Sequence, residues 1–214
     1  MKLSEGLNIQ GSEIKNIIFD WGGVITDLHP ELTINAFRAM GFKHFDEAFS
    51  QDENQNLFLQ FEMGKIDESA FINELKRQLD SHVTDKQVLD AWNALLGDLP
   101  AERWMLLKNL ANDYRIFLLS NTNSLHITYY FSKLEQLYGI YGYNHLFEKV
   151  YFSHHLGMRK PNRNIYEFVM KDSALLPEET LFIDDNPDNI DTARQLGITA
   201  YHLLPPLTLT DLFE

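Results

Sequence analysis

Four short segments of the sequence place polar, reactive side chains directly after runs of apolar residues. The first is FDWGGVITD, in which Asp20 follows an apolar run and precedes two nearby glycines. A carboxylate at the end of a rigid strand can act as a nucleophile, and glycines let the backbone approach a ligand closely. Taken alone, a strand-to-loop turn capped by an aspartate explains this segment equally well.

Two further segments carry groups that bind or neutralise an anion. In LLSNT, Ser120 and Asn121 stand where a strand is expected to end and a helix to begin, and N–H groups at a helix N-terminus favour anions. In GMRKP, Lys160 precedes a proline and is able to neutralise a phosphate together with a carboxylate nucleophile. Taken alone, a helix N-cap and a solvated basic turn are the simpler interpretations.

The fourth segment, FIDDNPDN, ends an apolar run with the adjacent carboxylates of Asp184 and Asp185. Two neighbouring carboxylates at the end of a buried strand repel each other and lose solvation, which is unfavourable unless a cation is present. Oxygen ligands of this kind suit Mg²⁺. A pair of helix-capping residues explains the segment less well, because one carboxylate is enough for a cap.

The hydrophobic pattern predicts the elements that position these segments. Short apolar, β-rich runs alternate with helical patterns, which indicates an α/β fold with a parallel sheet. The expected strands are Asn16–Phe19, Arg115–Leu119, Lys149–Phe152, Thr180–Ile183 and Thr199–Leu203. The expected helices around them are Glu102–Ala111, Ser124–Tyr138, Asn162–Met170 and Pro187–Leu196. Because ligands of such sheets bind beyond the carboxyl ends of the strands, the four segments are expected to converge.

The stretch from Pro30 to Leu96 breaks this alternation and shows no convincing strand pattern. Its apolar spacing predicts helices at Leu32–Met40, Phe45–Glu62, Glu68–Leu79 and Lys86–Leu96. Thr84 and Gln87 have the spacing of a capping box ahead of the last helix. A helical block between the first two strands of a sheet is an insertion. We therefore expect an α-helical cap domain at residues 30–96 and a core made of residues 1–29 and 97–214.

Composition limits the classes of function. The 214 residues include 18 basic and 31 acidic ones, and the resulting net charge of −13 disfavours binding to nucleic acid and to anionic membranes. The same charge repels an anionic substrate, so a phosphate site needs a local cation. The absence of cysteine excludes disulfides, thiolate catalysis and zinc–thiolate sites. Neither a signal peptide nor a membrane span is expected, and cytoplasmic location is the default. No oligomeric state is predicted.

The order of the four segments resembles that of the haloacid dehalogenase-like hydrolase superfamily. The motifs of that superfamily are an Asp-rich first strand, a Ser or Thr after the second strand, a Lys, and a final acidic pair. The resemblance runs from Asn16 to Leu203. It implies a Rossmann-like, doubly wound parallel sheet with an inserted helical cap. The phrase GMRKPNRNIYE is similar to the phosphatase branch that carries such a cap, so the resemblance implies a hydrolase of small phosphate monoesters, with sugar phosphates first.

The resemblance also implies a role for each matching position. Asp20 would attack phosphorus and form an aspartyl-phosphate. Ser120 and the Asn121 backbone would bind the transferring phosphate, and Lys160 would stabilise charge on the nucleophile and on the phosphate. The Mg²⁺ ligands would be Asp20, the backbone carbonyl of Gly22, Asp184 and Asp185. Asn189 stands where the family has a polar residue that supports the ligands.

One position departs from the family pattern, because Gly22 replaces the aspartate that serves as general acid and base two residues after the nucleophile. Losing a general acid costs about 10²–10⁴-fold in rate. A sugar phosphate with a good leaving group would need less acid help, as in phosphatases of glucose 1-phosphate with a Gly at this place. Alternatively, Thr26, Asp27 or a cap side chain supplies the proton.

Two other functions stay open at this point. The chain could have lost catalysis and kept ligand binding or a regulatory role. It could also be a metal-free haloalkanoate dehalogenase, since those enzymes lack the second aspartate as well. The pair of Asp184 and Asp185 fits the dehalogenase poorly, because a site without a cation must still accept a substrate carboxylate.

Overall fold

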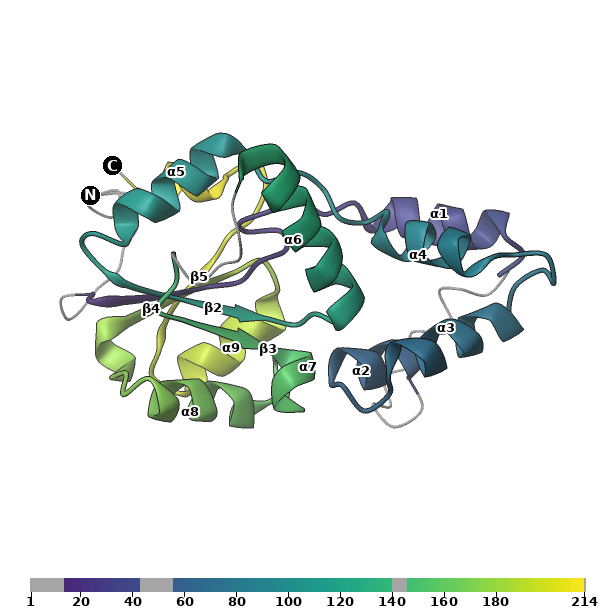
Figure 1. The fold of residues 1–214 in the computed structure, drawn as a ribbon. Helices are drawn as coiled ribbons and strands as arrows, with labels where there is room; N and C mark the ends of the chain where they lie inside the picture. The colour runs from purple at the N-terminus through teal and green to yellow at the C-terminus, as the bar shows by residue number, and fades with distance from the viewer. Residues whose placement is uncertain (1–13, 43–55, 140–145, 214) are drawn as a thin grey trace.

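A computed structural model gives the structure of residues 14–42, 56–139 and 146–213. Over these residues the strands form one five-stranded parallel sheet in the order β3-β2-β1-β4-β5 (Figure 1). The strands are β1 (Asn16–Phe19), β2 (Arg115–Ser120), β3 (Lys149–Phe152), β4 (Thr180–Asp184) and β5 (Thr199–His202). All five predicted strands are present, and β2 and β4 run one residue further than predicted, to Ser120 and Asp184.

Helices cover both faces of the sheet, with α5 and α6 on one side and α8 and α9 on the other (Figure 1). These helices are α5 (Ala101–Leu110), α6 (Ser124–Tyr138), α8 (Arg163–Asp172) and α9 (Pro187–Gln195). Successive residues of a strand point to opposite faces. Ile17 and Phe19 therefore pack in the layer with α5 and α6, and Ile18 packs in the layer with α8 and α9. The predicted doubly wound α/β fold is confirmed.

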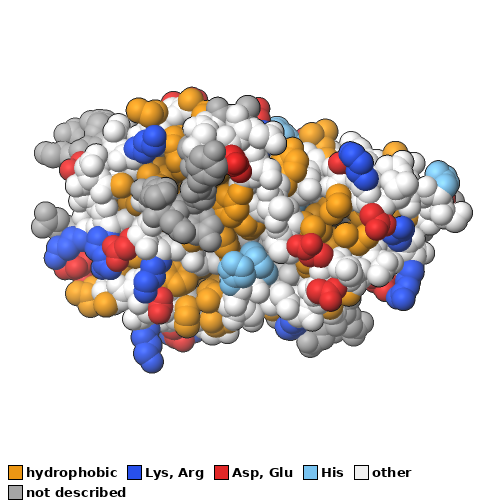
Figure 2. Space-filling model, viewed as in Figure 1, with side chains coloured by type: hydrophobic (Ala, Val, Ile, Leu, Met, Phe, Trp, Pro, Cys, Tyr) orange, Lys and Arg blue, Asp and Glu red, His pale blue; other side chains and the backbone are white. Residues whose placement is uncertain are grey.

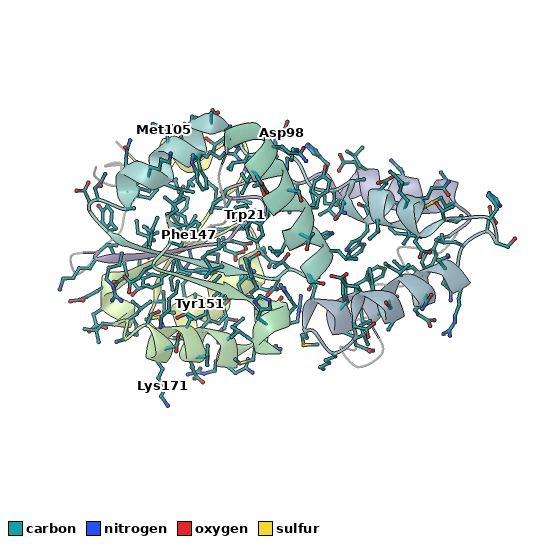
Figure 3. All side chains as sticks on the ribbon, viewed as in Figure 1. Trp21, Asp98, Met105, Phe147, Tyr151 and Lys171 are labelled. Carbon is teal, nitrogen blue, oxygen red and sulfur yellow. The ribbon has the colours of Figure 1, made fainter. Side chains whose placement is uncertain are left out.

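Side chains fill the two layers between helices and sheet. Figure 3 shows Trp21 and Phe147 within the α5–α6 layer, where both are buried, whereas Met105 and Lys171 project away from the sheet. Two short 3₁₀ helices lie at Pro177–Glu179 and Leu209–Leu212, and the second adds Leu209 and Leu212 to the core. Figure 2 shows charged side chains scattered among hydrophobic ones over the visible face. No helix in the described ranges has the length and apolar character that crossing a membrane requires.

Between Pro30 and Asn93 the chain forms a second group of helices, which lies beside the sheet in Figure 1 and which we call the helical lobe. Its helices are α1 (Pro30–Ala39), α2 (Leu57–Glu62), α3 (Glu68–Arg77) and α4 (Asp85–Asn93). The helical lobe has a hydrophobic core of its own, which is rich in aromatic rings. In it Phe61 and Phe71 stack with ring centroids 4.1 Å apart.

The bounds of the lobe helices differ from prediction. The helix α1 begins at Pro30 rather than at Leu32 and ends at Ala39 rather than at Met40, and α3 ends at Arg77 rather than at Leu79. Thr84 and Gln87 form the predicted capping box at the start of α4, but the helix ends at Asn93 rather than at Leu96. Leu96 instead forms an antiparallel bridge with Leu28, where the chain leaves and re-enters the core. The helix predicted at Phe45–Glu62 does not run unbroken, because α2 begins at Leu57 and Asn56 forms its N-cap. Residues 45–55 of that prediction lie outside the described ranges.

In the described residues, polar contacts join the helical lobe to the sheet layer at two places. At the first, the buried imidazole of His126 on α6 donates from Nε2 to the carbonyl of Trp92 on α4, at 3.1 Å. Asn123 caps α6 and accepts from Trp92 Nε1 at 3.3 Å. At the second, Ser153 begins the short helix α7 (Ser153–Leu156), and its Oγ donates to the carbonyl of Glu62 at 2.6 Å.

Candidate active site

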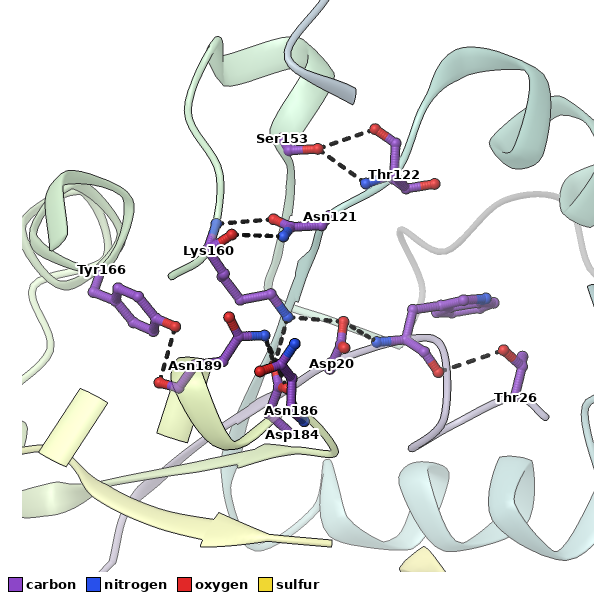
Figure 4. Close-up of polar contacts among 11 residues, drawn as sticks. Asp20, Thr26, Asn121, Thr122, Ser153, Lys160, Tyr166, Asp184, Asn186 and Asn189 are labelled. Carbon is purple, nitrogen blue, oxygen red and sulfur yellow. Dashed lines mark hydrogen bonds and ion pairs between the residues drawn. The ribbon is translucent and has the colours of Figure 1, made fainter. Parts of the chain in front are cut away.

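The structure brings the predicted site residues together at the carboxyl ends of three neighbouring strands (Figure 4). Asp20 follows β1, Ser120 and Asn121 lie at the end of β2, and Asp184 is the last residue of β4. Lys160 reaches the same place from the loop between α7 and α8. The convergence follows from the parallel sheet, since parallel strands end at one edge.

Lys160 links two of the carboxylates. Its Nζ lies 2.9 Å from Asp20 Oδ1 and 2.6 Å from Asp184 Oδ2, and its side chain is almost fully buried. A buried ammonium is tolerated only when it is paired and hydrogen-bonded. Burial by itself would lower the pKa of Lys160, but the carboxylates of Asp184 and Asp20 outweigh it and raise that pKa. Lys160 is therefore a fixed cation within the acidic cluster.

Asp20 lies in an environment that penalises its charge. Burial is the largest influence and, against the attraction of Lys160, raises the pKa of the Asp20 carboxyl to about 7, with Asp184 and Asp185 adding repulsion. The N–H of Trp21 donates to Asp20 Oδ1 at 2.7 Å and partly compensates this charge. One lysine does not balance three carboxylates, so the cluster would gain from a further cation.

Asp20, Asp184 and Asp185 have the arrangement of a cation site. Each offers one carboxylate oxygen, and these oxygens all lie within 4.8 Å of one another. An all-oxygen donor set of this charge fits Mg²⁺. Burial, and then the charge of Asp184, raises the pKa of Asp185. Gly22, the fourth predicted ligand, lies in the turn after Asp20 and forms an isolated bridge with Thr26.

Asp184 is held in place by several donors. The backbone N–H of Asn186 donates to its Oδ1 at 2.8 Å, and Asn189 Nδ2 lies 2.9 and 3.1 Å from its two oxygens. The Tyr166 hydroxyl in turn donates to the carbonyl of Asn189 at 3.0 Å. Asn189 thus has the supporting position that the resemblance implied. These bonds allow a fully buried carboxylate at the end of β4.

The side chain of Asn121 has a function in the site that sequence reasoning missed. Its Nδ2 donates to the carbonyl of Lys160 at 2.8 Å, and its Oδ1 accepts from the N–H of Lys160 at 2.9 Å. The two residues are 39 positions apart, so no local pattern signals this contact. The family resemblance implies a role only for the Asn121 backbone, as a phosphate ligand. The peptide bond between Lys160 and Pro161 is cis.

The loop after β2 is ordered by Ser153. Its Oγ accepts from the N–H of Thr122 at 2.9 Å and lies 3.0 Å from the Thr122 carbonyl (Figure 4). Ser120, the predicted phosphate ligand, is the buried last residue of β2 and pairs in register with Phe152. The segment that carries Ser120 and Asn121 is therefore fixed against its neighbouring strand.

Both glycines after Asp20 lie where a side chain would collide. A Cβ on Gly22 would lie 2.6 Å from Leu28 Cδ1, so Leu28 occupies the direction in which a residue at position 22 would project. Gly23 has a φ of +74°, and a Cβ there would lie 2.2 Å from Asp185 Oδ2. Glycine at position 23 therefore allows the turn after β1 to approach the acidic cluster.

Comparison with known proteins agrees with this architecture. A curated relative of Bacteroides thetaiotaomicron, D-ribitol-5-phosphate phosphatase, is 31% identical over 188 residues, which are 88% of this chain and 91% of the relative. A crystal structure of a HAD family enzyme of the same organism, in complex with magnesium and inorganic phosphate, is 35% identical. It has a TM-score of 0.84 and covers 94% of this chain and 100% of that one.

A second solved structure is similar along most of its length. The structure of a predicted HAD-like family hydrolase of Porphyromonas gingivalis is 39% identical, with a TM-score of 0.81 over 89% of this chain and 91% of that one. Residues 14–197 of this chain match the haloacid dehalogenase-like hydrolase family itself. Together with the parallel sheet and the acidic cluster at its edge, these likenesses show that the chain belongs to the haloacid dehalogenase-like hydrolase family.

Proposed function

We propose that the chain is a Mg²⁺-dependent phosphatase of small phosphorylated metabolites that works through an aspartyl-phosphate at Asp20. The observation that carries the proposal is the position of Lys160 Nζ, 2.9 Å from Asp20 and 2.6 Å from Asp184, beside the oxygen cluster that Asp185 completes. Sugar phosphates remain the expected class of substrate. The curated relative is named for D-ribitol 5-phosphate, so pentitol phosphates are the first substrates to test.

The residues of this chain divide the chemistry among them. An Asp20 carboxylate oxygen attacks phosphorus, and Lys160 balances the charge of the nucleophile and of the incoming phosphate. Ser120 and the backbone of Asn121 bind the phosphoryl oxygens at the end of β2. A bound Mg²⁺ supplies positive charge to the phosphoryl group as its bond to the leaving oxygen breaks. Water then releases phosphate from Asp20.

The metal fits the residues that the resemblance assigns to it. Asp20, Asp184 and Asp185 supply three carboxylate oxygens, and the backbone carbonyl of Gly22 is the proposed fourth ligand. Lys160 and Asn189 donate hydrogen bonds to the carboxylate oxygens of Asp184, and these bonds fix the orientation of the carboxylate. These four donors would leave part of the coordination shell of the ion for phosphate and water.

The helical lobe acts as the cap of the enzyme in this proposal. Residues 30–96 form the cap, and residues 1–29 and 97–214 form the core. Closing the lobe over the edge of the sheet would exclude water while the phosphoryl group is transferred. The separate hydrophobic cores of the two parts support this division. The net charge of −13 supports small-molecule substrates rather than nucleic acid, and cytoplasmic location stays a prediction.

The dehalogenase alternative is less well supported by the site. Without a metal, three clustered carboxylates would face the carboxylate of a haloacid with Lys160 as the nearby cation, which is electrostatically unfavourable. A purely binding protein is less well supported, because Lys160 contacts both Asp20 and Asp184 and the Asp185 carboxylate lies beside them.

The experiment is a phosphate-release assay with D-ribitol 5-phosphate, glucose 1-phosphate and p-nitrophenyl phosphate, with Mg²⁺ and with EDTA. Magnesium-dependent release from at least one of them supports the proposal. Full phosphate release in EDTA would contradict the dependence on Mg²⁺, whereas chloride release from a 2-chloroacid without any phosphate release would establish the dehalogenase. Binding of Mg²⁺ and phosphate without any turnover would favour the non-catalytic function.

A further inference from the structure

The proposed reaction needs a proton donor that Gly22 cannot supply. When the phosphorus–oxygen bond of an alkyl phosphate breaks, the leaving alkoxide must take a proton. Glycine has no titratable side chain, and Leu28 occupies the space into which a residue at position 22 would project. The donor must therefore come from another element.

Thr26 and Asp27, the two nearby donors considered from the sequence, are engaged elsewhere. The buried Thr26 hydroxyl accepts from Tyr130 OH at 3.0 Å, within the layer between the sheet and α6. Asp27 Oδ1 accepts from Arg103 Nη1 of α5 at 2.8 Å. Both contacts draw these side chains toward the helices rather than toward Lys160. A side chain from the helical lobe is the remaining source considered.

The end of α2 contacts Ser153, which in turn contacts the loop after β2 beside the site. Ser153 Oγ, which also contacts Thr122 after β2, donates to the carbonyl of Glu62 at 2.6 Å. Two residues further, a Cβ on Gly64 would lie 2.3 Å from the carbonyl of His154. This close approach fixes Glu62 at the junction of lobe and core.

The Glu62 carboxyl points toward the loop that carries Lys160. Its Oε2 lies 3.5 Å from Arg159 Nη2, and its side chain is 26% exposed. Lys160, the next residue after Arg159, holds Asp20 directly and acts electrostatically on Glu62. On α7, which packs against the end of α2, the titratable side chains are His154 and His155.

The contact with Arg159 is too weak to lock Glu62 as a carboxylate. It is a single long contact at 3.5 Å, and in the described part of the chain Arg159 Nε is buried without a hydrogen-bond partner. Burial raises the pKa of Glu62, although Arg159 and Lys160 act to lower it. Burial thus favours the protonated form of the Glu62 carboxyl, which is the form that a general acid needs.

We propose that Glu62, carried by the helical lobe, is the general acid and base of the phosphatase; this rests on the proposed function of the site. In the first half-reaction, Asp20 bonds to phosphorus, the bond to the leaving oxygen breaks, and the proton of Glu62 goes to that oxygen to give the alcohol. In the second, water bonds to phosphorus, its proton goes to Glu62, and the bond to Asp20 breaks to release phosphate. Glu62 is then protonated for the next cycle.

The test compares Glu62→Gln with the wild type on D-ribitol 5-phosphate, or the best alkyl phosphate found, and on p-nitrophenyl phosphate. Nitrophenolate leaves without a proton, so the variant should release about one equivalent of it per enzyme at close to the wild-type rate. Later turnovers should be slow, because the aspartyl-phosphate then lacks its base. With the alkyl phosphate no burst is expected, and kcat should fall by about 10²–10⁴-fold.

Control variants separate this function from a structural one. Glu68→Gln is the same change at an exposed position of α3, and it should leave the turnover rates of both substrates unchanged. In the wild type, deprotonation of Glu62 should lower kcat/KM at high pH. The pH profile of Glu62→Asp should keep this loss, and that of Glu62→Gln should not show it. The proposal would be overturned if Glu62→Gln and the wild type had equal first-turnover rates on the alkyl phosphate. It would also be overturned if Glu62→Gln slowed the first turnover of the alkyl phosphate and that of p-nitrophenyl phosphate equally. A wild type without Mg²⁺-dependent activity would instead contradict the proposed function.

Discussion

The side-chain amide of Asn121 bonds both backbone polar groups of Lys160, at 2.8 and 2.9 Å, and thereby fixes the loop from which the lysine reaches Asp20. Asn121 directly follows β2, so the position of Lys160 is tied to the sheet rather than to its own loop. Lys160 Nζ must contact Asp20 and Asp184 at the same time, and a small displacement of its backbone would break one of those contacts.

We expect Asn121→Ala to lower kcat by about 10- to 100-fold with a smaller change in KM, since two hydrogen bonds of about 1 kcal/mol each are lost. Steady-state kinetics on the best substrate measures the effect. Asn112→Ala removes an exposed asparagine whose side chain makes one 3.4 Å contact, and it should match the wild type. An Asn121→Ala enzyme with unchanged kcat would show that Lys160 is positioned without the amide.

Gly23→Ala should weaken Mg²⁺ binding, because its Cβ would lie 2.2 Å from Asp185 Oδ2 and push that carboxylate out of the cluster. The matched control is Gly139→Ala at the end of α6, where φ is +62° but no atom of the described residues lies within 4 Å of the added Cβ. Both variants lose about 1–2 kcal/mol of stability from left-handed backbone strain. Isothermal titration with Mg²⁺ should separate them, and equal Mg²⁺ affinity in the two would contradict the assignment of Asp185.

Mg²⁺ should stabilise the folded chain independently of catalysis. A ligand that binds only the folded state adds about 2.7 kcal/mol at 100 times its dissociation constant. Thermal unfolding with and without saturating Mg²⁺ measures this, and EDTA should reverse it. Asp185→Asn should abolish the Mg²⁺ response while raising the stability of the metal-free chain, since it removes repulsion within the cluster. A full Mg²⁺ response in that variant would place the ion elsewhere.

His126 should make the fold less stable in mild acid. Burial lowers its pKa from 6.5 to about 4 in the folded chain, so the unfolded chain binds a proton first as the pH falls. Stability is therefore lost between pH 6.5 and 4, by roughly 2–4 kcal/mol at most from this residue. Urea unfolding at pH 7 and pH 5 should show a smaller difference for His126→Gln than for the wild type. Equal differences would show that another group causes the acid sensitivity.

Much of the fold could be predicted because its signals are local. Buried parallel strands appear as short apolar runs, and the capping residues Thr84 and Asn186 mark the starts of α4 and α9. Asp20 and Asp184 could be placed together because each ends such a run. The Leu28–Leu96 bridge that shortens α4 could not be predicted, since it depends on two segments that meet only in three dimensions.

The partners of the site residues are non-local in the same way. Nothing near Asn121 in the sequence indicates that its side chain binds the backbone of Lys160 rather than a phosphate. Likewise, Glu62 lies at the junction of lobe and core because Ser153 and His154 contact the end of α2. In both cases the residue type was visible, but its geometric partner was not.

The central claim is that Asp20 carries the phosphoryl group, and mass spectrometry of enzyme quenched in acid during turnover of p-nitrophenyl phosphate with Mg²⁺ tests it most directly. The account predicts a phosphorylated peptide containing Asp20 in the wild type and in the exposed control Asp191→Asn, and no such peptide and no turnover in Asp20→Asn, with all three equally folded. Undiminished turnover in Asp20→Asn, or phosphate found on another residue, would contradict it.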